Sequence, residues 1–250
     1  MPEERKETKT RVAIVTGGSR GIGRAVVEAL LGEGWRVHFC SRSAESVETT
    51  LAELAGRFGG AVQGKPVDVR HEGEVDFFVR GVAEAEGGRI ECLVNNAGLG
   101  IFGPVDELSG DAFREVIETN LLGPFYFLRA VARVMKPRGE GWIFNIASLA
   151  GKNPMAGGAA YNASKFGLVG FSEASMLDLR QSGIRVASIL PGSVDTDFGH
   201  PGHPGGGGGT GESWRLKPQD IAAMILHLLT YPPNALPSLV EMRPARPPKK

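Results

Sequence analysis

Short runs of apolar, often β-branched residues alternate along most of the chain with longer segments in which apolar residues recur with helical spacing. Residues 71–86 show this spacing clearly, because their apolar positions fall at i, i+3, i+4 and i+7 and form one stripe. These residues are Val75, Phe78, Val79 and Val82. Strands are predicted at 12–16, 36–40, 61–67, 90–95, 141–147, 184–190 and about 237–242. Most of these runs are apolar on both faces, which is typical of parallel strands covered by helices on each side.

The order of the elements predicts an α/β fold with a three-layer, doubly wound parallel sheet of about seven strands. No composition break or linker occurs before residue 198 and no internal repeat is found, so we expect one domain over residues 11–243. Residues 1–10 and 244–250 are predicted to be solvated tails. The segment 198–217 contains five consecutive glycines and is predicted to be a mobile loop before a last helix at 218–230.

Charge and composition narrow the classes of partner. The 250 residues carry 28 basic and 28 acidic side chains, so the chain lacks the long-range attraction that nucleic-acid and anionic-membrane binding require. No apolar run approaches the roughly 18 residues of a membrane span, and residues 1–10 hold no apolar stretch typical of a signal peptide. We therefore expect a cytoplasmic protein with a small-molecule substrate and no nucleic-acid or membrane partner. Cys40 and Cys92 lie in apolar runs and are expected to be buried, reduced thiols.

A glycine-rich turn follows the first predicted strand directly. The sequence TGGSRGIG places Gly17, Gly21 and Gly23 between that strand and a helix predicted from Arg24 to about Leu31. Glycines permit a tight turn and let backbone N–H groups at a helix N-terminus approach a pyrophosphate. Glycine clusters also occur in purely structural turns, so it is the position after the first strand that favours a nucleotide-binding loop.

The end of the second predicted strand bears on the identity of the nucleotide. An acidic residue that would bind the ribose 2′-hydroxyl of NAD is missing there. Ser41 and Arg42 occupy this place, and with Arg20 they offer groups that can bind the 2′-phosphate of NADP. We therefore predict a preference for NADP(H) over NAD(H), the alternative being that both arginines are solvated surface charges. Asp68, at the end of the third strand, can accept from the adenine amino group or cap a helix.

Tyr161 and Lys165 lie four residues apart on a predicted helix and therefore share one face. A tyrosine with a pKa of about 10 is a poor acid and base at neutral pH, but an adjacent ammonium is expected to lower that pKa. The pair then forms a general acid/base. This spacing also occurs on ordinary surfaces, so Ser148 strengthens the interpretation. It ends an apolar strand, where open α/β sheets bind ligands, and its hydroxyl can hydrogen-bond a substrate carbonyl.

Taken together, the motifs resemble those of the short-chain dehydrogenase/reductase family from residue 11 to about 197. They are TGGSRGIG at 16–23, NNAG at 95–98, Asn120 within ETN, Ser148, YNASK at 161–165 and PGSVDT at 191–196. The resemblance implies a single-domain Rossmann fold and hydride transfer between a nicotinamide and a carbonyl carbon. It implies that Tyr161 moves the proton while Ser148 polarises and positions the carbonyl. It also implies that Lys165 lowers the tyrosine pKa and that Asn120 anchors a water relaying protons to Lys165.

The resemblance also implies a set of cofactor-binding residues. At the phosphates these are Gly17, Ser19, Arg20 and Ile22, with Gly21 and Gly23 completing the glycine loop, and at the adenine they are Asp68 and Val69. Asn95, Ala97 and Gly98 are expected to line the cofactor, and Pro191, Gly192, Val194 and Thr196 to hold the nicotinamide carboxamide. Tyr161 and Lys165 are also expected to contact the nicotinamide ribose.

We therefore predict an NADP(H)-dependent oxidoreductase that interconverts a carbonyl and an alcohol. The alternatives are a 3-oxoacyl-[acyl-carrier-protein] reductase, a non-catalytic NADP-sensing regulator, and an epimerase or dehydratase of the extended branch. The C-terminal segment from Lys217 resembles instead the subgroup acting on small 3-hydroxy acids, semialdehydes and miscellaneous carbonyls.

The same resemblance implies a homodimer or homotetramer formed through the helices at 106–135 and 158–182. It also implies that loop 198–217 covers the substrate, with Phe198 and Trp214 as its apolar elements. His200 and His203 are expected to be plain loop residues, and no metal site is predicted.

Overall fold

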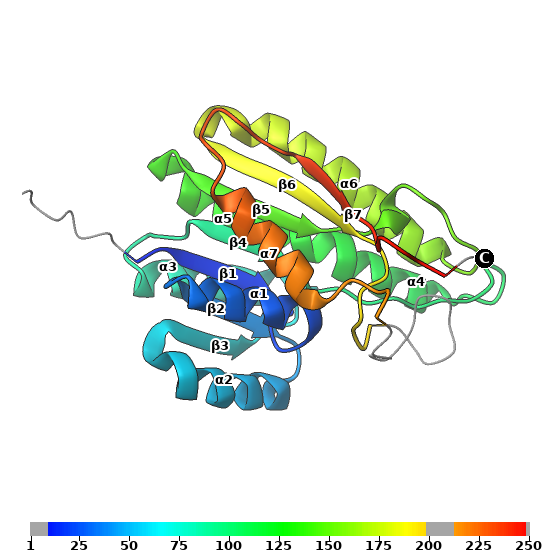
Figure 1. The fold of residues 1–250 in the computed structure, drawn as a ribbon, viewed down its shortest axis with the longest axis horizontal. Coiled ribbons are helices and arrows are strands. Elements are labelled where there is room, and N and C mark those ends of the chain that lie inside the picture. The colour runs from blue at the N-terminus through cyan, green and yellow to red at the C-terminus, as the bar shows by residue number, and fades with distance from the viewer. Residues whose placement is uncertain (1–9, 199–212, 249–250) are drawn as a thin grey trace, which may run out of the picture.

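The computed structural model describes residues 10–198 and 213–248 and shows one parallel sheet with helices on both faces (Figure 1). Its seven strands follow the order β3-β2-β1-β4-β5-β6-β7. Their bounds are β1 Val12–Thr16, β2 Arg36–Ser41, β3 Val62–Pro66, β4 Cys92–Asn95, β5 Gly141–Ile146, β6 Ile184–Pro191 and β7 Leu239–Met242. The predicted doubly wound parallel sheet of about seven strands is confirmed.

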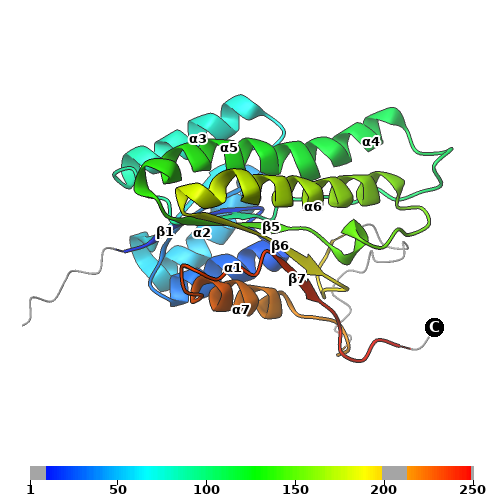
Figure 2. The ribbon, with the colours of Figure 1, turned by 90° about the horizontal axis from the view of Figure 1, so that it is seen from above.

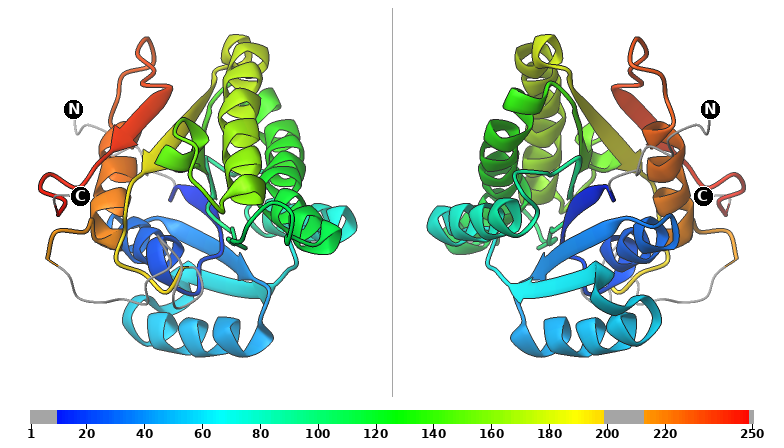
Figure 3. Two further views of the ribbon diagram at one scale, coloured as in Figure 1. Left: turned by 90° about the vertical axis from the view of Figure 1, so that its right-hand side faces the viewer. Right: turned by 90° about the vertical axis from the view of Figure 1, so that its left-hand side faces the viewer.

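Two helical layers enclose the sheet (Figures 2 and 3). The helices are α1 Gly21–Gly32, α2 Ala44–Phe58, α3 Glu72–Ala85, α4 Gly110–Ile117, α5 Gly123–Met135, α6 Ala159–Leu179 and α7 Pro218–Leu229. Side chains of α1, α2 and α7 join one apolar cluster with the sheet, and those of α3, α5 and α6 join a second cluster on the opposite face. The strand order reverses at β1, between β2 and β4, and such a switch point is where open α/β sheets bind ligands.

The alternation of side chains along β1 explains why this strand is apolar throughout. Ala13 and Val15 belong to the cluster beneath α1 and α7, whereas Val12 and Ile14 belong to the cluster beneath α3 and α5. Every residue of β1 is buried. Each large apolar side chain buried in this way stabilises the fold by about 1.5–3 kcal/mol.

The region predicted as helix at 106–135 is not one continuous α-helix. A π-helix, Glu118–Leu122, joins α4 to α5, and the backbone N–H of Gly123 donates to the carbonyl of Glu118. Pro124 follows at the start of α5, where the missing N–H of a proline costs little. The i to i+5 bonding widens the turn, so that Asn120 lies at a local change of helical register.

Residues 1–9, 199–212 and 249–250 lie outside the described residues, and with them most of the predicted loop 198–217 and both His200 and His203. Within the described ranges, no helix has both the length and the apolar composition that crossing a bilayer requires.

Candidate active site

The glycine loop joins β1 to α1 through a backbone that only glycine adopts easily. Gly17 has φ +65° and Gly21 has φ +55°, both in the left-handed region. At Gly23, an added Cβ would lie 2.1 Å from the carbonyl oxygen of Gly17, so no larger residue fits. The sequence predicted that the helix begins at Arg24, but α1 begins at Gly21, because these small residues allow its first turn to pass directly against the loop.

The N-terminus of α1 differs from those of α2 and α4. Ser43 caps α2 and Ser109 caps α4 through their hydroxyl oxygens. In contrast, no side chain in the described parts of the chain caps α1, and its first turn holds no acidic residue. Uncapped N–H groups at the positive end of a helix dipole are suited to an anion. The cradle therefore fits the pyrophosphate of a dinucleotide.

Hydrogen bonds fix the end of β4 beside this loop. The Thr16 hydroxyl oxygen accepts from the backbone N–H groups of Asn96 and Ala97, at 3.0 Å each. The Asn96 amide nitrogen donates to the carbonyl oxygens of Thr16 at 3.0 Å and Gly17 at 3.2 Å. The predicted cofactor residues Gly17 and Ala97 are thus held together. Sequence reasoning missed these roles of Thr16 and Asn96, although both residues lie inside the recognised motifs TGG and NNAG.

On the adenosine side, the predicted 2′-phosphate residues lie at the end of β2. The Ser19 hydroxyl donates to the Ser41 hydroxyl oxygen at 3.0 Å, which brings the glycine loop and β2 together. Arg20 is exposed. The guanidinium of Arg42 is also exposed, and its Nη1 lies 3.4 Å from Oε1 of Glu115 on α4. No acidic residue of β2 itself occupies this corner.

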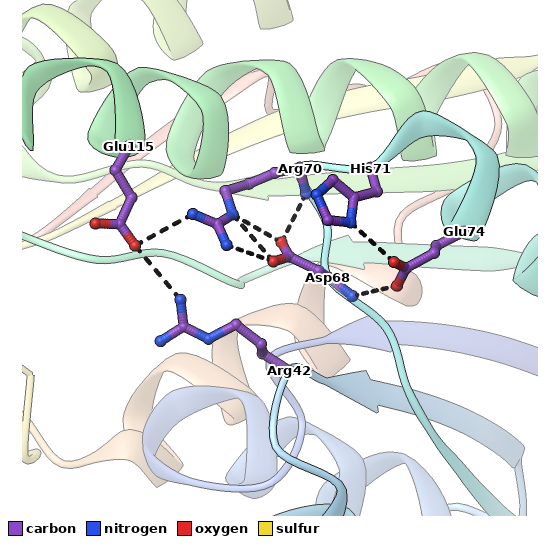
Figure 4. Close-up of polar contacts among 6 residues, drawn as sticks. All are labelled: Arg42, Asp68, Arg70, His71, Glu74 and Glu115. Atoms are coloured by element: carbon purple, nitrogen blue, oxygen red, sulfur yellow. Dashed lines mark hydrogen bonds and ion pairs between the residues drawn. The ribbon is translucent and has the colours of Figure 1, made fainter. Parts of the chain in front are cut away.

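Glu115 bridges two arginines, as Figure 4 shows. Its Oε1 also lies 3.3 Å from Nη1 of Arg70, which in turn binds Asp68 with an Nη2–Oδ2 distance of 2.6 Å. The hydrogen bonds from Arg70 hold the pKa of Asp68 below its ordinary value. The predicted adenine ligand is therefore an ionised acceptor, already engaged by a neighbouring guanidinium. Sequence reasoning missed Arg70 and Glu115, because their contacts depend on the packing of α4.

The predicted catalytic residues converge at the carboxyl ends of β5 and the first turns of α6. Ser148 follows β5, and its hydroxyl is hydrogen-bonded with Tyr161. The Lys165 ammonium donates to the carbonyl oxygen of Ile146 at 2.9 Å and lies 5.7 Å from the centre of the Tyr161 ring. Both Tyr161 and Lys165 are buried. The spacing in YNASK thus does place the two side chains on one face of a helix.

Burial dominates the titration of this pair. It lowers the pKa of Lys165 to about 8, because the charged ammonium loses water. It also raises the pKa of Tyr161, while the hydrogen bond with Ser148 acts in the opposite direction. The sequence predicted that Lys165 lowers the pKa of Tyr161, whereas burial of the phenol raises it. Tyr161 therefore holds its proton at neutral pH and can serve as a donor.

Asn120 connects three elements around this centre. Its Oδ1 accepts from the backbone N–H of Leu99 at 2.9 Å, and its Nδ2 donates to the Leu99 carbonyl oxygen at 2.8 Å. The same nitrogen donates to the Ser164 hydroxyl at 3.0 Å. An added Cβ at Gly98 would lie 3.2 Å from the Asn120 amide oxygen and 3.8 Å from the Lys165 nitrogen, so that Gly98 lies against both. Asn120 thus ties the π-helix to the loop after β4 and to α6, and its water relay stays a prediction.

The segment expected at the nicotinamide end runs from β6 back toward the glycine loop. Pro191 ends β6, and the Gly192 N–H donates to the Met242 carbonyl oxygen of β7 at 2.7 Å. Val194 forms an isolated bridge with Leu216, and an added Cβ at Gly21 would lie 3.4 Å from the methyl carbon of Thr196. Thr196 therefore lies beside the glycine loop, and its role at the nicotinamide carboxamide stays a prediction.

Val69, Ile22 and Asn95 are the remaining predicted cofactor residues, and their role toward a cofactor stays a prediction. Val69 is buried against Gly123 at the start of α5, and Ile22 packs partly buried on the cluster beneath α1. Asn95 is buried at the end of β4, where its amide nitrogen donates to the Asn145 amide oxygen at 2.9 Å. Asn95 therefore anchors the sheet beneath the site.

Aromatic side chains surround Tyr161. The ring of Phe102 lies 5.4 Å and the ring of Phe198 lies 5.7 Å from the Tyr161 ring, measured between centroids. Phe102 also lines a cleft of about 480 Å³ formed with residues 103–106 and 155–157. Phe102 carried no motif in the sequence, and only the loop geometry after β4 places it here.

Comparison with known proteins agrees with this geometry. The family model described as short chain dehydrogenase matches residues 11–204. A putative ketoacyl reductase of Streptomyces coelicolor is 41% identical over 189 residues, which cover 75% of this chain and 72% of that protein. An alcohol dehydrogenase from the archaeon Thermococcus sibiricus, complexed with 5-hydroxy-NADP, superposes with a TM-score of 0.85 and 31% identity, covering 97% of this chain and 100% of that one.

A variant of the actinorhodin polyketide ketoreductase with NADPH superposes with a TM-score of 0.83 and 33% identity, covering 94% and 96% of the two chains. The matching fold, the ordered motifs and the identity to these proteins lead to one assignment. The chain belongs to the short-chain dehydrogenase/reductase family of oxidoreductases, which act on carbonyl and alcohol groups.

Proposed function

We propose that this protein is an NADPH-dependent carbonyl reductase in which Tyr161 is the general acid. The observation that carries the proposal is a buried tyrosine, hydrogen-bonded with Ser148, whose ring lies 5.4 Å from that of Phe102 on the wall of a cleft. A similar ketoacyl reductase and a similar ketoreductase with NADPH support reduction of a ketone as the direction of the reaction.

The residues of the site divide the chemistry among them. When bound, the reduced nicotinamide supplies a hydride to the carbonyl carbon and is itself oxidised. Tyr161 gives its phenolic proton to the carbonyl oxygen, so that an alcohol forms. Ser148 hydrogen-bonds the same oxygen and orients the carbonyl. Lys165, held by the Ile146 carbonyl, stabilises the phenolate left on Tyr161, and this stabilisation is greatest in the transition state as the charge develops.

The preference for NADPH over NADH is part of the proposal. The glycine cradle with its uncapped helix accounts for binding of a pyrophosphate, which both cofactors share. Ser41 and the exposed guanidinium of Arg42 support recognition of the 2′-phosphate, which only NADPH carries. The neighbouring protein structures that contain NADPH or 5-hydroxy-NADP are consistent with this preference.

We further propose a homodimer or homotetramer in the cytoplasm. The exposed large apolar side chains include a group on α4, α5 and α6, the helices from which an interface was predicted. They are Phe113, Phe125, Phe166 and Leu177. Exposed apolar side chains gathered on adjacent helices are typical of an interaction surface.

Replacing Tyr161 with phenylalanine tests the function. Turnover of NADPH with a carbonyl substrate is expected to fall by about 10²- to 10⁴-fold, the usual contribution of a positioned acid. The dissociation constant for NADPH, measured by fluorescence titration, is expected to stay within a few-fold. Tyr126→Phe on α5 is the matched control and is expected to keep full activity.

Two outcomes would contradict the proposal. More than a few per cent of wild-type kcat in Tyr161→Phe would remove Tyr161 from the mechanism. A wild-type protein that binds NADPH but reduces no aldehyde, ketone, 3-oxo acid or 3-oxoacyl thioester would support the regulatory alternative instead.

A further inference from the structure

The rings of Phe102 and Phe198 both lie close to that of Tyr161, and Phe102 also lines the neighbouring cleft. The rings of Phe102 and Phe198 are tilted against the Tyr161 ring by 55° and 50°. The backbone of Gly100 supports both phenylalanines, because an added Cβ there would lie 2.6 Å from the Phe102 ring and 3.3 Å from the Phe198 ring. A carbonyl substrate bound at Tyr161 would therefore have aromatic rings close to it.

The cleft beyond these rings is walled by two loop segments. One runs from Phe102 to Asp106 and the other from Met155 to Gly157, and the Gly103 N–H donates to the Gly157 carbonyl oxygen at 2.8 Å where the walls meet. The volume of about 480 Å³ lies within the roughly 300–1,000 Å³ of pockets that hold drug-sized molecules. Gly103 and Gly157 have no side chains to fill the cleft, and the flexible side chain of Met155 can adapt to apolar ligands of irregular shape.

Charge in the cleft is confined to one carboxylate. Among the residues that the structure describes along its walls, Asp106 is acidic and none is basic. A substrate carboxylate placed here would gain no cationic partner and would be repelled by Asp106. Flat apolar groups, in contrast, would find the ring of Phe102, Pro104 and Met155 to contact.

We propose that the substrate of this site is a neutral ketone with bulky apolar substituents, aromatic or alicyclic, and not a small 3-oxo acid or another carboxylate. This inference rests on the proposed carbonyl reductase activity and specifies its substrate class. It also separates the chain from the subgroup that acts on small 3-hydroxy acids, which its C-terminal segment resembles.

Matched substrate pairs test the inference. 2-Acetylnaphthalene is compared with 6-acetyl-2-naphthoate, and ethyl 3-oxobutanoate with 3-oxobutanoate, under NADPH saturation. Within each pair the neutral member is expected to have a kcat/KM at least tenfold higher. A higher kcat/KM for the carboxylates would overturn the inference and leave the proposed function intact.

Two variants link the preference to the cleft. Phe102→Ala is expected to raise KM for 2-acetylnaphthalene about tenfold, with NADPH affinity unchanged. Val105→Arg, at a side chain that is 75% exposed, places a cation on the wall without disturbing the fold and is expected to raise kcat/KM for 6-acetyl-2-naphthoate. Phe77→Ala, on the distant helix α3, is the control. If Val105→Arg and the wild type have the same kcat/KM for both naphthalenes, this cleft does not determine specificity and the inference is contradicted.

Binding provides a readout that does not require turnover. Saturation-transfer NMR on the unreactive Tyr161→Phe protein with NADP⁺ is expected to show stronger binding of 2-acetylnaphthalene than of its carboxylate. If no carbonyl in any panel is reduced but this order of binding holds, the proposed function fails while the assignment of the cleft stands. Preferential binding of the carboxylate would contradict the assignment of the cleft, whatever the reaction.

Discussion

Replacing Arg42 with alanine is expected to weaken NADPH binding while leaving NADH binding within a few-fold. The Arg42 side chain is 66% exposed and makes one long contact, 3.4 Å, with Glu115. Exposed ion pairs of this kind contribute about 0.2–1 kcal/mol, whereas a charge-assisted hydrogen bond to a phosphate contributes about 1.5–3 kcal/mol. When Arg42 leaves Glu115 and binds the 2′-phosphate, the binding free energy therefore improves by about 1–2 kcal/mol. Removing the Arg42 side chain is expected to lower NADPH affinity by about five- to thirtyfold.

The same geometry predicts that a substitution at Glu115 has the opposite effect on NADPH affinity. Its carboxylate competes with the 2′-phosphate for Arg42 and repels it, so Glu115→Gln is expected to tighten NADPH binding by up to about fivefold. Arg70 remains held by Asp68, which keeps the surrounding loop in place (Figure 4).

Fluorescence titration of both reduced cofactors at low and high salt measures these effects. The differences are expected to shrink as salt rises, because exposed charges are screened. The controls are Arg57→Ala on α2 and Asp111→Asn on α4, both exposed charges of the same kind. Equal losses for NADPH and NADH in Arg42→Ala, or weaker NADPH binding in Glu115→Gln, would refute the reasoning.

Three further predictions concern other parts of the molecule. Gly23→Ala is expected to weaken NADPH binding at least tenfold and to lower the unfolding temperature, because the new Cβ collides with the Gly17 carbonyl oxygen of the glycine loop. Gly32→Ala on the same helix is the control and is expected to change neither quantity, because a Cβ there meets open space. NADPH affinity is expected to fall above about pH 8. Burial lowers the pKa of Lys165 to about 8, so the ammonium is present below that pH and is lost above it. A dissociation constant that does not change with pH would contradict this prediction. Phe166→Asp is expected to reduce the oligomer to smaller species in light scattering while Phe77→Asp does not, and an unchanged mass would exclude that face from the interface.

The strands and the glycine loop could be predicted from the sequence because their determinants are local. A strand such as β1 is buried on both faces, so its apolar run marks both its existence and its limits. The order of the TGG, NNAG and YNASK motifs likewise identified residues that the fold brings into one site. These signals are read from neighbouring positions in the chain.

Other features depend on contacts between distant segments and left no such signal. The π-helix arises where α4 and α5 meet, and the bridge from Arg42 to Glu115 joins residues 73 positions apart. The predicted direction of the Tyr161 pKa shift was wrong, because sequence spacing reveals a neighbouring charge but not the extent of burial. Phe102 could not be identified for the same reason, since its role depends on how the loop after β4 folds onto α6.

The uncapped start of α1 has a consequence for the lifetime of the protein. A ligand that binds only the folded chain at a hundred times its dissociation constant adds about 2.7 kcal/mol to the free energy of unfolding. Proteases act on the unfolded or locally opened chain, so a nucleotide that completes α1 slows degradation as well as enabling the reaction. Under the proposed function, the abundance of the enzyme in the cell then rises and falls with the supply of its dinucleotide cofactor.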